Sequence, residues 1–94
     1  MKEFKGTPGP WFIDNGRAIG PKSTEDDQSY GMIIPVGWVE FDPEVEVQIA
    51  NQRMMAAAPE LLEALQIICF FEDISSAQRE IAEAAIAKSL GESQ

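Results

Sequence analysis

The sequence contains no histidine and only one cysteine, and both absences narrow the chemistry open to it. Histidine is the commonest general base and metal ligand, so serine–histidine and cysteine–histidine catalytic arrangements are excluded. One cysteine cannot form a disulfide within the chain or supply a zinc site of the usual cysteine and histidine ligands. Because Cys69 lies in the most apolar stretch, we expect an inert, packed thiol.

Other functional signals are missing as well. The glycine-rich patterns of phosphate-binding loops do not occur, and the first residues lack the apolar core of a signal peptide. The longest apolar run, 61–71, is interrupted by Glu63 and Gln66, so it is too short to span a membrane. The acidic run 25–27 lacks the ligand pattern of an EF-hand. We therefore expect a cytosolic protein that is no enzyme and has no metal or cofactor.

Acidic side chains dominate the charge of this sequence. Its 94 residues include 16 acidic and 7 basic side chains, giving a net charge of −9. Such a charge disfavours direct binding to nucleic acid, which requires neutralisation of phosphates. It is compatible with two readings: solubility, or a decoy that presents carboxylates to a protein that normally binds phosphates.

The length fits one domain, 1–94, whose first half is β-rich. We expect an irregular arm at residues 1–10, because Pro8 and Pro10 lack N–H donors. Within the β region 11–49, the pair Asn15-Gly16 predicts a type I′ hairpin turn between strands 11–14 and 17–20. The polar segment 22–29 is predicted to be an exposed, mobile loop.

A second β region is predicted over residues 30–39. Pro35 cannot donate a ladder hydrogen bond, so it indicates an edge strand or a bulge, and Gly37 weakens the strand interior. Val45 and Val47 alternate with acidic residues, which predicts a further short, half-exposed strand.

Helical periodicity is predicted for residues 51–91. Asn51 is expected to cap a short first helix, and Pro59 to end it and begin the next. Ser75 and Gln78 form a capping box for a third helix that pairs antiparallel with the second. The expected inner faces are Leu61, Leu62, Leu65, Ile68 and Cys69 on the second helix, and Ile81, Ala82, Ala85, Ile86 and Leu90 on the third, with Gly91 after its end. The fold class is α+β: a small antiparallel β-sheet followed by a short helix and an antiparallel helix pair.

The C-terminal half of the second helix is apolar on every side, so it must be covered on every side. A chain this short has little else to cover it with. We therefore predict a homo-oligomer whose interface includes Ile67, Phe70 or Phe71. The alternative is that the sheet and the last helix cover it completely.

Three residues are candidates for ligand binding. Trp11 follows the proline-rich arm and either caps the core or offers its indole face to a base or a partner. Asn51 and Arg53 lie at the predicted helix start, where free N–H groups and a guanidinium together bind an anion. The structural alternative for this pair is a helix cap and an internal salt bridge.

Two motifs give the sequence a family resemblance. Residues 7–11 read T-P-G-P-W, and residues 51–65 resemble N-A-R-L-I-A-A-A-P-E-L-L-E-A-L, with Gln52 in place of alanine and Met54-Met55 in place of leucine and isoleucine. The chain thereby resembles short accessory proteins encoded by bacteriophages and prophages. The resemblance implies a phage protein acting in the host bacterial cytoplasm. Its layout is also similar to that of the Thoeris anti-defence proteins, oligomers that sequester nucleotide immune signals.

These observations favour a non-catalytic antagonist of bacterial immunity that acts by binding. One version sequesters a small nucleotide, with Asn51 and Arg53 near its phosphates and Trp11 near its base. The rival is an acidic inhibitor that binds a host defence protein, as an anti-CRISPR or a DNA mimic does. A third reading is a structural or regulatory phage protein.

Overall fold

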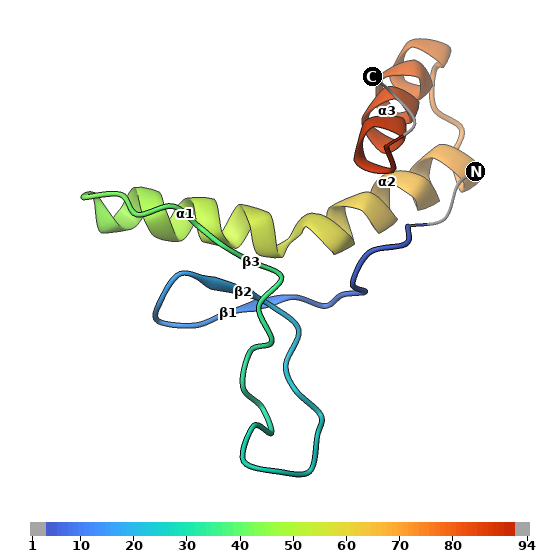
Figure 1. The fold of residues 1–94 in the computed structure, drawn as a ribbon. Helices are drawn as coiled ribbons and strands as arrows, with labels where there is room; N and C mark the ends of the chain where they lie inside the picture. Colours follow the sequence, from blue (N-terminus) through green and yellow to red (C-terminus); the bar gives the residue numbers. More distant parts are fainter. Residues whose placement is uncertain (1–3, 92–94) are drawn as a thin grey trace. The chain divides into compact units, whose positions relative to one another are not determined.

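The alternating residues of the first half form a small antiparallel sheet (Figure 1). The computed structural model describes residues 4–91. Strands β1 (Phe12–Ile13), β2 (Ala18–Gly20) and β3 (Gly37–Trp38) pair in that order, with β2 in the centre and fully buried. The expected α+β class is thus confirmed: three antiparallel strands precede three helices.

The β1–β2 turn lies where the asparagine–glycine pair predicts it, but its type differs. A type I′ turn needs positive φ at both central residues, and within residues 4–91 only Gly31 and Gly91 have positive φ. Instead, the Asp14 carboxylate accepts a hydrogen bond from the N–H of Gly16 at 2.9 Å. This Asx-type contact shapes the turn without left-handed backbone.

The β3 region confirms both expectations attached to Pro35. β3 lies at one edge of the sheet. Val36 donates to the carbonyl of Ile19 at 2.7 Å, yet the ladder partner of Ile19 is the next residue, Gly37. Val36 and Gly37 therefore both lie opposite Ile19, which is the pattern of a β-bulge.

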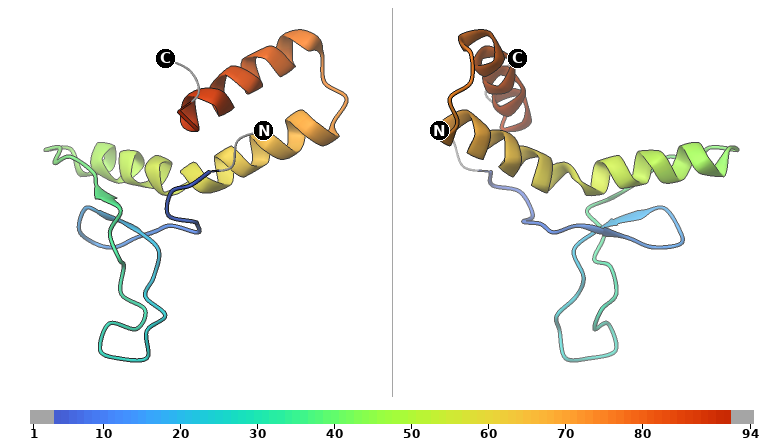
Figure 2. Two further views of the ribbon diagram at one scale, coloured as in Figure 1. Left: turned by 45° about the vertical axis from the view of Figure 1, so that its right-hand side comes forward. Right: turned by 180° about the vertical axis from the view of Figure 1, so that it is seen from behind.

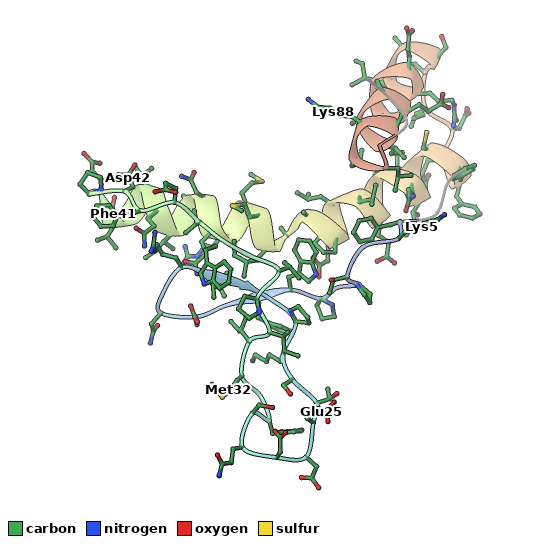
Figure 3. All side chains as sticks on the ribbon, in the orientation of Figure 1. Lys5, Glu25, Met32, Phe41, Asp42 and Lys88 are labelled. Atoms are coloured by element: carbon green, nitrogen blue, oxygen red, sulfur yellow. The ribbon has the colours of Figure 1, made fainter. Side chains whose placement is uncertain are left out.

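Residues 21–34 continue the β2–β3 pair as a narrow loop, here called the hairpin extension, which carries Glu25 and Met32 (Figure 3). Backbone bonds join Ser23 to Met32 at 2.7 Å and Gly31 to Ser23 at 2.9 Å. Ser23 is buried, contrary to the exposure expected for 22–29, although the acidic tip is exposed. The mobility of this segment stays a prediction.

Helix α1 (Val45–Ala56) begins well before Asn51, the start predicted from the sequence. The predicted strand at Val45 and Val47 is wrong, and so is the N-cap role of Asn51, which lies within the helix. The preceding turn explains the early start: the Asp42 carboxylate accepts from the Glu44 N–H at 2.8 Å, and the Gln48 amide oxygen accepts from the Asp42 N–H at 3.0 Å.

Helices α2 (Ala58–Phe71) and α3 (Ser76–Ser89) form a hairpin in which α3 turns back along α2 (Figure 2). The capping box of Ser75 and Gln78 is confirmed, as is Gly91 with a φ of 79° after the helix end. Cys69, Ala82 and Ile86 form the buried centre, with Leu62, Leu65 and Leu90 packed around them.

Part of the predicted inner faces is wrong. Leu61, Ile68, Ile81 and Ala85 are exposed, because the contact between the two helices is narrower than the apolar surface of either helix. Cys69 packs in the core, as expected.

The chain divides into two compact units: Thr7–Pro59 holds the sheet and α1, and residues up to Gly6 together with those from Glu60 onward hold the helical hairpin. Within the part of the chain described, no single helix has the length and apolarity to cross a membrane; α1 and α2 meet the criteria only when taken together across their break.

Candidate functional site

The motif around Asn51 and Arg53 has a buried structural residue at its centre. Gln52 is 1% exposed, and its side-chain amide lies 3.1 Å from the carbonyl oxygen of Ala18 and 3.2 Å from that of Gly16. A third carbonyl, that of Asp14, lies at 3.4 Å. The two N–H groups of the amide are thus shared among three carbonyls from Asp14 to Ala18, and they hold the β1–β2 turn and the start of β2 against α1.

This arrangement separates Asn51 from Arg53. The two residues precede and follow the inward-facing Gln52 by one position, and one residue turns an α-helix by about 100°. Their side chains thus leave α1 on opposite flanks, about 160° apart. Both are exposed, and Arg53 lies in the last turn, where its charge complements the negative end of the helix. The predicted anion site at a helix start is not formed.

Trp11 is half-buried beside the arm, and its indole N–H donates to the carbonyl of Thr7 at 3.3 Å. The two motifs behind the family resemblance also meet here. A methyl group added at Gly9 would lie 2.7 Å from the ring of Pro59, so only glycine fits this contact. The arm is therefore a packed element, and the ligand roles of Trp11, Asn51 and Arg53 stay predictions.

In the unit Thr7–Pro59, a series of exposed apolar side chains follows the chain into β3. Every second residue there exposes a large apolar side chain: Tyr30 70%, Met32 61%, Ile34 51%, Val36 42% and Trp38 63%. These five residues are here called the apolar row. The sequence predicted a second β region over residues 30–39, but it did not reveal which of its side chains are uncovered.

Backbone contacts hold the middle of the apolar row, residues 32–36, extended. Tyr30 lies in the turn before Gly31, and the bulge at Val36 and Gly37 places Trp38, the partner of Ala18, on the opposite face of the strand from Val36. Ile34 donates to the carbonyl of Pro21 at 2.7 Å, and Lys22 and Ile33 form a further antiparallel bridge. A methyl group added at Gly20 would collide with the backbone carbonyl of Ile34, so this close approach requires glycine.

Acidic side chains flank the apolar row at both ends. Glu25, Asp26 and Asp27 lie at the tip of the hairpin extension, and Glu40 and Asp42 follow β3. Hydrogen bonds from the hydroxyl of Ser29 at 2.6 Å and from its N–H at 2.7 Å lower the pKa of Asp27 below its ordinary value. Within residues 4–91, no cluster of three or more acidic or cysteine side chains has the arrangement of a metal site.

Comparison with known proteins relates this chain to one phage family. The model of the family described as Salmonella phage P22 protein Y8K6 matches residues 1–93. No curated protein and no solved structure matches it significantly.

Proposed function

Because the chain belongs to the family of Salmonella phage P22 protein Y8K6, we propose that it is a non-catalytic phage accessory protein that binds a host protein through the apolar row. The observation that carries this proposal is the exposure of five large apolar side chains within one short segment whose backbone is hydrogen-bonded to residues 19–23. The setting that we propose is the host bacterial cytoplasm, and the biological role is antagonism of a host defence system.

The size and composition of the row support a protein partner. A tyrosine or tryptophan side chain offers about 150–250 Å² of surface. At exposures of 70% and 63%, Tyr30 and Trp38 each present roughly 100–150 Å², one in the turn and the other on the opposite face of the strand from Val36. Between them, Met32, Ile34 and Val36 expose one apolar face, and aromatic residues and methionine are enriched in protein interfaces.

The flanking charges indicate the chemistry of the partner. No charged residue lies between Gln28 and Val39, whereas acidic groups border this segment on both sides. The complementary surface is an apolar groove rimmed by lysine or arginine. Proteins that bind nucleic acid carry such basic surfaces, so this proposal develops the acidic-inhibitor reading of the sequence.

Side chains rather than main-chain pairing carry this binding. Ile34 and Val36 direct their N–H groups to β2, so the alternate residues face the open edge. Pro35 occupies that outward row and has no N–H to donate, which disfavours addition of a partner strand.

The nucleotide-sequestering version has less support, because Asn51 and Arg53 lie on opposite flanks of α1. Of this pair, Arg53 carries the charge that a phosphate would contact, and it lies in the last turn of α1, at the helix end that repels anions.

Photo-cross-linking in the host tests this proposal. A cross-linking amino acid replaces Trp38 in one variant and Ala84, an exposed residue of α3, in a control. We expect position 38 to capture one host protein reproducibly and position 84 not to capture it. Met32→Ser with Trp38→Ser should abolish both the capture and the protein's effect on phage plating on a defended host, while Ile81→Ser, which also removes an exposed apolar side chain, should change neither.

A thermal-shift screen with cyclic dinucleotides and ADP-ribose derivatives separates the two mechanisms. A ligand that binds the native state raises Tm by mass action. A rise in Tm that Arg53→Ala abolishes and the row variant does not would contradict our proposal and support nucleotide sequestration.

A further inference from the structure

Helix α2 carries two apolar stripes, and α3 covers only one of them. The covered stripe consists of Leu62, Leu65 and Cys69. The uncovered stripe consists of Leu61, Ala64, Ile68 and Phe71, all of which are exposed, with Phe71 at 80%. Because each residue of the covered stripe directly follows one of the uncovered stripe, the stripes lie about 100° apart around the helix.

The uncovered stripe has the spacing of a helix–helix interface. Its residues follow one another at intervals of three, four and three, which is the a and d pattern of a heptad repeat. A helical face that meets only water needs no such spacing. The pattern therefore indicates that another helix packs along this side of α2.

We propose that a second copy of this chain occupies the uncovered stripe, pairing α2 with α2 so that two helical hairpins form a four-helix bundle. The available area supports this occupant. The ring of Phe71, at 80% exposure, presents roughly 120–200 Å². This is about a fifth of the roughly 800 Å² that one partner contributes to a stable interface, and Leu61, Ile67 and Ile68 extend it.

Charge favours the same occupant. Two copies with a net charge of −9 each repel one another wherever their acidic groups meet. Residues 64–71 carry no charge, so a two-fold axis near Ile68 brings only uncharged helical surface together.

The small core of the hairpin supplies the reason for association. Its fully buried residues, Cys69, Ala82 and Ile86, include only one large aliphatic side chain. A second hairpin would double the number of packed helices and bury the uncovered stripe, which is a common solution for a small domain. This interface lies in a different unit from the apolar row, so the two proposals fail independently.

Sedimentation velocity from about 0.1 to 100 µM, a range that brackets a micromolar Kd, tests the inference on the full chain. We expect a species of twice the mass of the 10.4 kDa chain. Ile68→Glu and Phe71→Glu should each raise the dissociation constant by about a hundredfold or more, because an unpaired charge would be buried in the interface. Ala84→Glu adds the same charge on an exposed position of α3 and should leave the dimer intact.

Circular dichroism shows whether each variant keeps its helices, and Phe71 is too exposed for its replacement to disturb the core. A second measurement uses Ile68→Cys in a Cys69→Ser background, which should form an intermolecular disulfide under mild oxidation that an Ala84→Cys control does not form. A monomeric wild-type chain, or association that survives both glutamate variants, would overturn the inference.

Discussion

At the scale of single residues, Gln52 contributes more to the stability of the fold than its neighbours Asn51 and Arg53 do. Gln52→Ala would leave three carbonyl oxygens of the β1–β2 turn without their donor. We expect a loss of about 1–3 kcal/mol in the free energy of unfolding, measured by urea denaturation. Gln52→Glu should cost more at pH 7, because a carboxylate cannot donate and would face these oxygens.

Asn51→Ala is the matched control on the same helix. A true N-cap asparagine would lose about 1 kcal/mol on this replacement. Within the body of α1, where the structure places it, alanine should be neutral or slightly stabilising. A clear loss for Asn51→Ala would contradict the observed start of α1.

Asp27 provides a prediction for pH. Hydrogen bonds from Ser29 lower the pKa of Asp27 below 3.8 in the folded chain, so the folded state favours the carboxylate. The resulting contribution to stability is present above the unfolded pKa and is lost as the pH falls through the folded pKa. Ser29→Ala removes the side-chain bond, so an NMR titration of Asp27 should show its pKa rising toward 3.8; an unchanged pKa would rule out this cause.

At the scale of secondary-structure elements, Arg79 of α3 closes the C-terminal end of α2. Its guanidinium donates to the carbonyl oxygens of Cys69 and Glu72, groups that a helix end leaves without partners. We expect Arg79→Ala to lower the free energy of unfolding by about 1–2 kcal/mol, through lost hydrogen bonds and lost charge at the helix terminus. Arg79→Lys should recover part of the loss, and Arg17→Ala, at an exposed site, should change stability little.

The contact between β2 and the chain entering β3 leaves no space for a side chain at Gly20. A methyl group there would meet the Ile34 carbonyl and lie 3.0 Å from the nitrogen of Val36. We expect Gly20→Ala to lower the free energy of unfolding by about 1–3 kcal/mol, because the backbone must move to make room for the methyl group. Gly37→Ala is the control, since a methyl group at Gly37 would have no neighbour within 4 Å; equal losses at both sites would contradict this contact.

At the scale of the whole molecule, self-association through α2 would link stability to concentration. If the native state is a dimer, its Tm should rise as the chain concentration increases from about 1 to 100 µM, because mass action favours the associated state. Calorimetry of the wild type and of Phe71→Glu checks this; the dependence should vanish in the variant. A Tm independent of concentration in both proteins would argue for a monomer.

Local signals in the sequence determined much of the secondary structure of this protein. The capping box at Ser75, the glycine after α3 and the break in strand pairing next to Pro35 each depend on bonds or steric limits within a few residues, so the chain specifies them before it folds. The α+β order and the packed Cys69 follow from periodicity in the same way.

Only the tertiary structure decided the rest. The alternation at Val45 and Val47 resembles a strand, but the residues belong to α1, whose Gln52 reaches the β1–β2 turn across a separation of 34 positions or more in the sequence. Periodicity finds the apolar side of a helix or strand, but not how much of that side a neighbour covers. The pattern predicted an oligomer interface at Ile67, Phe70 or Phe71, but only packing showed which stripe of α2 is uncovered and which side chains of the apolar row are exposed.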